Sequence, residues 1–172
     1  MLENGDISLR ALEPKDVDTL FIWENDRRNW RVSHTLSPFS RHAIAQYIES
    51  VRDIHTDKQL RLMIVEKSSE KAVGAIDLFD CDFKNHRSGI GVLIADTDAR
   101  NHGLASQTLE VLIEYCFKEL GFHQLYCGIQ VDNAASLALF KKFGFREIGI
   151  RKDWNYFNGQ FSDEISLQLI NG

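Results

Sequence analysis

One helical pattern, at residues 104–120, stands in the middle of a chain whose other apolar patterns mostly alternate. Its apolar residues recur every three or four positions: Ala105, Leu109, Leu112, Cys116 and Leu120. This spacing is typical of a helix with one buried face. Alternating segments at residues 88–95 and 124–131 lie before and after it and predict strands. A strand, a helix and a further strand form one crossover unit, so these two strands are predicted to run parallel.

The remaining patterns surround this unit with short strands and helices. Strands are predicted at residues 7–11, 60–66, 72–80, 145–154 and 161–170, and helices at residues 17–25, 41–54 and 134–143. Residues 26–39 have no clear periodicity and are interpreted as a loop that sets specificity. These elements predict one α/β domain over residues 1–172, with a mixed, mostly antiparallel sheet of roughly six to seven strands and about four helices.

Composition restricts the classes of function. The 172 residues are 44% hydrophobic and 26% charged with two prolines, as expected of one compact globular domain. Cys81, Cys116 and Cys127 are far apart, without a Cys-x-x-Cys pair, which indicates reduced thiols in a cytoplasmic protein and no metal site. The polar N-terminus and the lack of a long apolar run argue against secretion and membrane spanning. A net charge of −5 argues against nucleic acid and favours a cationic acceptor.

The loop before the central helix carries the clearest chemical signal. Its sequence is Arg100-Asn101-His102-Gly103-Leu104-Ala105-Ser106. Because the loop lies between a strand and a helix, its backbone N–H groups are the unpaired donors of the first helical turn, and with the helix dipole they form an anion site. Gly103 and Ala105 carry little or no side chain, so a pyrophosphate can approach the backbone closely. No Gly-Lys-Ser/Thr follows, which excludes the phosphate loop of a nucleotide hydrolase.

With Arg100-x-x-Gly103-x-Ala105, this loop resembles the acetyl-CoA signature Arg/Gln-x-x-Gly-x-Gly/Ala of the GNAT superfamily of N-acetyltransferases. A second family block, NAASLALFKKFGF at residues 133–145, follows at the expected distance. The similarity extends over residues 7–169 and looks closest to the branch of spermidine and diamine acetyltransferases and ribosomal-protein N-terminal acetyltransferases. It implies the GNAT fold, in which the central sheet splays apart in the middle and leaves backbone groups free for the ligand.

The resemblance implies acetyl-CoA as the acetyl donor and no metal. Carried over position by position, it places the donor against Val92, Leu93, Ile94, Arg100, Asn101, His102, Gly103, Leu104, Ala105, Ser106, Asn133, Ser136, Phe140 and Lys142. The strand residues pair with the pantetheine arm and the loop residues hold the pyrophosphate. The residues between 133 and 142 lie beside the pantetheine, the thiol and the phosphates. A backbone N–H near Leu93 or Ile94 is the expected oxyanion donor.

Acetyl transfer to an amine needs a proton acceptor for the amine and a proton for the leaving thiolate. Many relatives carry a Tyr acid where this chain has Phe140, and often a Glu where it has Gly89. Ser136 and Tyr156 are the candidate catalytic replacements for the acid. Each also has a simpler interpretation, since Ser136 is placed to cap a helix and Tyr156 to pack at a hairpin rim.

Acidic and aromatic residues indicate where the acceptor binds. The candidate acceptor contacts are Glu24, Asp26, Trp30, Asp77 and Asp80. Asp77, Asp80 and Asp82 are interpreted as one face of a strand, and Asp80 matches a carboxylate of polyamine-acetylating relatives. The other candidates lie near the end of the first helix, where such relatives line the acceptor cleft. Both groups can also be read as solvated side chains at a sheet edge and a helix end.

These observations lead to one leading hypothesis and one from a different class. The first is an acetyl-CoA-dependent N-acetyltransferase that acetylates a primary amine of a small molecule by direct attack in a ternary complex. A polyamine such as spermidine or a diamine is the favoured acceptor, with amino sugars and protein N-termini as alternatives. The second is a catalytically silent acyl-CoA-binding sensor. Phe140 and Gly89 support it, because they stand where many relatives carry a Tyr acid and a Glu. The expected partners exclude nucleic acid and membrane, and homo-oligomers are common among such relatives.

Overall fold

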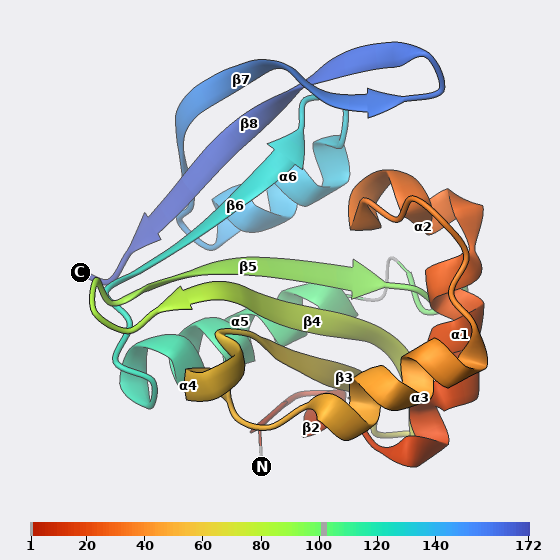
Figure 1. Cartoon of the computed structure of the whole chain (residues 1–172). Coiled ribbons are helices and arrows are strands. Elements are labelled where there is room, and N and C mark those ends of the chain that lie inside the picture. The colour runs from red at the N-terminus through yellow and green to blue at the C-terminus, as the bar shows by residue number, and fades with distance from the viewer. Residues whose placement is uncertain (1, 101–102) are drawn as a thin grey trace.

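The computed structural model describes residues 2–100 and 103–172, which form one sheet with helices on both faces (Figure 1). Within these residues, eight strands lie in the sheet order β1 (Leu2–Asn4), β2 (Ile7–Ala11), β3 (Leu60–Glu66), β4 (Lys71–Asp82), β5 (Arg87–Ile94), β6 (Gln124–Gln130), β8 (Gln160–Ile170) and β7 (Arg146–Phe157). The described helices are the 3-10 turn η1 (Pro14–Asp16) and six α-helices, α1 (Val17–Asn25), α2 (Arg27–Ser33), α3 (Arg41–Ser50), α4 (Ile54–Asp57), α5 (Leu104–Lys118) and α6 (Ala134–Lys142).

The sheet is mixed, as the sequence predicts. β5 and β6 are parallel, and the other neighbouring pairs of the described sheet are antiparallel. The predicted crossover is confirmed, because α5 carries the chain from β5 to β6. The predicted numbers of strands and helices are too low, since β1, α2 and α4 are absent from the prediction.

The missed elements are short and depend on a tight turn and on side-chain caps. β1 pairs with β2 through a turn in which Gly5 has φ 49°, a backbone conformation that favours glycine. In the segment predicted to be a loop, the Asp26 carboxylate caps α2 by accepting a hydrogen bond from the Arg28 N–H (2.9 Å). Asp53 caps α4 in the same way, and α3 ends at Ser50, before the end predicted for the helix over residues 41–54.

Alternating side chains along β3 point into two separate cores. Leu62 and Ile64 join a large cluster that includes side chains of α5 and α6. Met63 joins a smaller cluster with Leu20 of α1 and Ile44 of α3. Because neighbouring strand residues face opposite sides of a sheet, α1 and α3 cover one face, and α5 and α6 cover the other (Figure 1).

Pairing between β5 and β6 ends early. The pairing covers three residue pairs, the last of which is Gly89↔Tyr126. Beyond this pair the two strands move apart, away from the side of the sheet where the C-terminus lies (Figure 1). β5 remains paired with β4 as far as Ile94, and β6 remains paired with β8 as far as Gln130. The splayed sheet implied by the resemblance is therefore present, with the facing edges of β5 and β6 open beyond their last pair.

A register shift in the β4–β5 pair lies between Asp77 and Asp82, which were predicted to share a face with Asp80. The shift lies between Phe79 and Asp82, and Asp80 within it has φ 49°. The Asp77 carboxylate is hydrogen-bonded to a β3 side chain, whereas Asp80 lines a separate pocket with Asp82 and Tyr126. Leu78 and Cys81 both face the large core across this irregularity, so Asp77, Asp80 and Asp82 lie on the opposite face, as predicted, although Asp77 and Asp80 line different pockets.

The Phe79 ring covers Gly89 across the β4–β5 pair. A Cβ added at Gly89 would lie 2.1 Å from Phe79 Cε2, a distance that real Cβ atoms essentially never show. The same ring packs edge-on against Tyr126, with 6.1 Å between the ring centroids. The space above residue 89 is therefore filled from the neighbouring strand.

Gly89→Ala is expected to destabilise the protein, because the Phe79 ring must leave its position and lose its contact with Tyr126. Overpacking of this kind lowers the free energy of unfolding by about 1–3 kcal/mol, which urea denaturation measures. Gly149→Ala is the matched control, since a Cβ at Gly149 meets no described atom within 4 Å. Equal stability of the two variants would contradict the packing argument.

Candidate active site

A cleft of about 120 Å³ opens where β5 and β6 diverge. Its described lining comes from both strands, from α6, from β8 and from the end of α2: Val32, His34, Ile90, Gly91, Val92, Cys127, Gly128, Ile129, Gln130, Asn133, Ser136, Phe140 and Glu164. Four predicted donor contacts, Val92, Asn133, Ser136 and Phe140, lie in this lining. Two more, Leu93 and Ile94, follow Val92 on β5 and are paired with β4. The fold thus brings together the predicted residues of β5 and α6.

The loop before α5 is joined to the end of β5. The Arg100 Nε donates to the Ile94 carbonyl (3.0 Å), and Gly103, with φ 75°, is the N-cap residue of the 15-residue α5. Leu104 begins the helix inside the core, with 3% of its surface exposed. The predicted contacts Asn101 and His102 lie outside the described residues. The first-turn N–H groups of a helix of this length are unpaired donors that, with the helix dipole, favour an anion.

A lysine reinforces this anion site from α6. The Lys142 Nζ donates to the Ser106 Oγ (3.1 Å), which joins the last turn of α6 to the first turn of α5. Both residues are predicted donor contacts, and the half-buried Ala105 lies beside them on α5. An ammonium group beside a helix N-terminus adds a full positive charge to the partial charge of the helix dipole. The pair is therefore suited to a phosphate group.

Ser136 carries the one hydroxyl group among the described residues that line the cleft. Asn133 caps this helix by accepting a hydrogen bond from the Ser136 N–H (3.2 Å) on its side-chain oxygen. Phe140 follows one turn later, is 3% exposed and packs edge-on against Phe145, with 5.0 Å between the ring centroids. Both Ser136 and Phe140 line the cleft, so an alcohol and an apolar ring stand on the same wall.

Tyr156, the second predicted acid, lies away from this wall. It is 65% exposed on the β7–β8 hairpin, and its ring packs against Phe161, with 4.9 Å between the centroids. It is not among the described residues that line the cleft. The structure therefore does not bring Tyr156 together with Ser136.

The one thiol in the described cleft lining is protonated at neutral pH. Burial raises the pKa of the free Cys127 thiol to about 12, and the nearby Glu164 carboxylate adds to the shift. Since the thiolate is the reactive form of cysteine, Cys127 is a poor nucleophile in this position. Its side chain contributes to the core and to the cleft wall.

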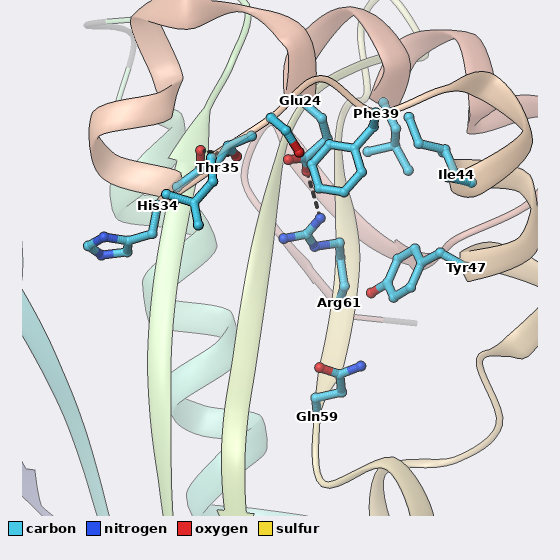
Figure 2. A pocket seen from close by; sticks show the side chains of 13 residues that line it. Glu24, His34, Thr35, Phe39, Ile44, Tyr47, Gln59 and Arg61 are labelled. Carbon is cyan, nitrogen blue, oxygen red and sulfur yellow. Dashed lines mark hydrogen bonds and ion pairs between the residues drawn. The ribbon is translucent and has the colours of Figure 1, made fainter. Parts of the chain in front are cut away.

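A larger pocket of about 580 Å³ adjoins the cleft, and His34 lines both. Residues of α1, α3, β3 and the segment after α2 surround it (Figure 2). The Arg61 side chain stands between two carboxylates, donating from Nη1 to Glu24 (2.8 Å) and from Nε to Asp77 (2.6 Å). Two carboxylates and one guanidinium leave one net negative charge beside this pocket.

Burial and charge act in opposite directions on Arg61. Burial lowers the pKa of its guanidinium, but the Asp77 and Glu24 carboxylates outweigh that effect and hold the pKa above its usual value. Burial also raises the pKa of Tyr47, whose hydroxyl is directed toward Arg61 (Figure 2). At neutral pH the pocket therefore contains a charged Arg61 and a neutral Tyr47.

Two of the predicted acceptor contacts hold α2 in place instead of lining either pocket. The Asp26 carboxylate pairs with the Arg28 guanidinium (2.6 Å) in addition to capping the helix. The Trp30 Nε1 donates to the Glu24 carbonyl (2.8 Å), which fixes α2 against the end of α1. Neither is among the described lining residues, whereas Glu24 lines the large pocket and Asp77 a smaller one next to it.

Three polar residues of the cleft are absent from the sequence predictions: His34, Gln130 and Glu164. Gln130 joins β6 to α2, because its Nε2 donates to the Arg31 carbonyl (3.0 Å). Glu164 is 6% exposed and reaches the cleft from β8. The one feature of the sequence that could have indicated Glu164 is Gly128, since a glycine inside a strand indicates that another group approaches its backbone closely.

This arrangement can be compared with known proteins. The family model described as acetyltransferase (GNAT) domain matches residues 6–146. The chain belongs to the GNAT acetyltransferase family. It is 25% identical over 169 residues to the uncharacterized N-acetyltransferase p20 of Bacillus licheniformis, covering 95% of this chain and 92% of that one. It is 28% identical over 174 residues to the putative ribosomal N-acetyltransferase YdaF of Bacillus subtilis, covering 97% and 92%.

A solved structure has the same fold as this GNAT acetyltransferase. The crystal structure of spermidine N-acetyltransferase from Vibrio cholerae, in complex with CoA and spermine, matches it with a TM-score of 0.88. The match covers 97% of this chain and 96% of that chain at 20% sequence identity. At this identity the likeness shows the fold.

As a GNAT acetyltransferase, the chain takes its acetyl group from acetyl-CoA. The described residues fit this donor: the open edges of β5 and β6 offer backbone hydrogen bonds, and α5 with Lys142 offers an anion site. Among the described residues, no group of His, Cys, Asp and Glu side chains is placed to hold a metal ion. None of the described helices combines the length and the apolar character needed to cross a membrane.

Lys142→Ala is expected to weaken binding of acetyl-CoA, because the variant removes the cation beside the α5 N-terminus. Loss of one hydrogen bond to a charged group corresponds to about a tenfold rise in the KM for acetyl-CoA, with kcat nearly unchanged. Lys141→Ala is the matched control, since Lys141 pairs with Glu147 instead (2.6 Å). The assignment is wrong if steady-state kinetics show the same KM in both variants.

Proposed function

We propose that this GNAT acetyltransferase acetylates a primary amine of a small molecule, with a polyamine such as spermidine or a diamine favoured. The observation that carries the proposal is the junction at His34, which lines both the cleft and the 580 Å³ pocket. An acceptor bound in the larger pocket can therefore extend an amine past His34 to the acetyl group in the cleft.

The charges of the pocket favour a cationic acceptor. Arg61 neutralises one of the two carboxylates of Glu24 and Asp77, which leaves one net negative charge. The Glu24 side chain is 23% exposed and lines the pocket, so a bound ammonium group can approach it. The net charge of −5 attracts cations to the protein as a whole.

The proposed reaction is direct attack of the neutral amine on the thioester carbonyl in a ternary complex. The open edge of β5 near Leu93 supplies the backbone N–H that stabilises the oxyanion. Ser136 supplies a proton to the leaving thiolate from the opposite wall. The raised pKa of Cys127 argues against an acyl-enzyme intermediate.

The test is thiol release from acetyl-CoA with a panel of polyamines, diamines, amino sugars and N-terminal peptides. We expect turnover with spermidine or a diamine, and Ser136→Ala is expected to lower kcat by about 100-fold if its hydroxyl is the acid. Ser162→Ala, on β8 outside the described cleft lining, is the control. Turnover with another acceptor class alone would reject the polyamine assignment. CoA binding without thiol release from any amine would support the sensor instead.

We also propose that the protein forms homo-oligomers. Large apolar side chains on the β7–β8 hairpin are each more than half exposed: Ile148, Ile150, Trp154, Tyr156 and Phe161. Several exposed large apolar side chains on one hairpin are typical of a protein interface. Light scattering is expected to give a multiple of the 19.8 kDa chain mass, and Ile150→Asp is expected to lower it. A mass of one chain at working concentration would reject the proposal.

We place the enzyme in a reducing compartment, the cytoplasm. Cys81, Cys116 and Cys127 are all free and buried. Free buried thiols are typical of proteins that work where glutathione and thioredoxin keep cysteines reduced.

A further inference from the structure

Glu164 carries a carboxylate into the acyl cleft from a strand that does not border it. β8 lies behind β6, where Glu164 is paired with Gln130. Its side chain nevertheless lines the cleft, because Gly128 has no side chain to block it. A Cβ added at Gly128 would lie 2.3 Å from the Glu164 Oε1. The carboxylate therefore occupies the space above the backbone of β6.

Two side chains of β7 hold this carboxylate. The Arg151 Nη1 donates to Oε1 (2.8 Å), and the Asn155 Nδ2 donates to Oε2 (3.2 Å). Arg151 is paired with Glu164 in the sheet, and a register shift between Arg151 and Asn155 lets the second residue reach the same carboxylate. Asp153, with φ 50°, lies within that shift. Each oxygen is thus held by one donor from the side away from β6.

The held carboxylate keeps acceptor capacity for a ligand. An ionised carboxylate has about four lone-pair sites, and the two described hydrogen bonds use one on each oxygen. Glu164 is the one carboxylate among the described residues that line the cleft, and His34 is the one imidazole among them. His34 is exposed at the end of α2, whereas Glu164 is buried beside the open edge of β6.

Resting on the proposed function, we propose that Glu164 is the base that accepts a proton from the ammonium group of the acceptor. A primary ammonium has a pKa near ~10.4, so a neutral nucleophile requires this transfer. The first N–H proton moves to the carboxylate, and the neutral nitrogen forms the N–C bond to the thioester carbonyl. The C–S bond then breaks, the Ser136 hydroxyl protonates the leaving thiolate, and the second N–H proton passes to Ser136 in its place. Glu164 finally releases its proton to solvent.

Arg151 and Asn155 act as positioning residues in this proposal. Both hold the carboxylate in one place, and each gives one described hydrogen bond to a different oxygen. The neighbouring carboxylate of Asp163 has a different environment, since it pairs with Lys152 (2.7 Å) and is not among the described cleft residues. Of these two adjacent acids of β8, Glu164 therefore acts in the cleft and Asp163 stabilises the hairpin.

Glu164→Gln tests the proposal, because it keeps the shape of the side chain and removes the proton acceptor. With spermidine or another alkylamine, kcat/KM is expected to fall by about 100-fold or more, and the limb of the pH profile that reports the base is expected to disappear. With a methoxyamine-type acceptor, which is already neutral at the assay pH, the loss is expected to be far smaller. A purely structural role would reduce turnover of both acceptors equally, and that result would overturn the proposal.

Two further variants keep the test decisive. Gly128→Ala displaces the carboxylate while retaining its charge, and it is expected to lower alkylamine turnover by at least about tenfold. Asp163→Asn is the control and is expected to keep the wild-type rate and pH profile. Wild-type rates in both Glu164→Gln and Gly128→Ala would overturn the proposal.

Failure of the proposed function is recognised separately, as wild-type protein that releases no thiol with any amine. In that case, calorimetric titration of spermidine into the CoA-bound protein decides the role of Glu164. A dissociation constant at least about tenfold higher in Glu164→Gln than in the wild type would support its contact with the ammonium group. An unchanged dissociation constant would overturn it.

Discussion

The early end of pairing between β5 and β6 is the constraint on which the rest of the site depends. Beyond the Gly89↔Tyr126 pair, β5 remains paired with β4 and β6 with β8, but β5 and β6 no longer pair with each other. Backbone N–H and C=O groups on the two inner edges must then find water or a ligand, because leaving them unpaired is costly. The cleft, the proposed oxyanion donor and the binding of an extended thioester arm all follow from this divergence.

Two glycines, Gly89 and Gly128, make room for side chains of neighbouring strands beside the cleft. Gly89 on β5 is covered by Phe79, and Gly128 on β6 is covered by the Glu164 carboxylate. In both cases, a neighbouring strand supplies the group that the glycine lacks. The aromatic group therefore lies where the strands are still paired, and the anionic group lies where they have separated.

The parts predictable from sequence are those that a local pattern determines. The periodicity of residues 104–120 is enough to predict α5 and the crossover, and residues 133–145 predict α6, although its cap is Asn133 and not Ser136. α2 is missed because its cap at Asp26 is a single side chain in a segment without periodicity. Glu164 is missed for a different reason: its position depends on Gly128, which is distant in sequence and adjacent only after β6 and β8 pair.

The paired charges also bear on which amines suit the enzyme. Arg61 contacts both Asp77 oxygens but only one described oxygen of Glu24, so the second Glu24 oxygen remains available on the large pocket. Glu164 offers a second, separate carboxylate in the cleft, and His34 lies at the junction between the two spaces. A monoamine can satisfy one of these acids. Under the proposed function, a diamine or polyamine places its reacting amine near Glu164 and a distant ammonium near Glu24, so the two acids together fit an acceptor with two separated positive charges.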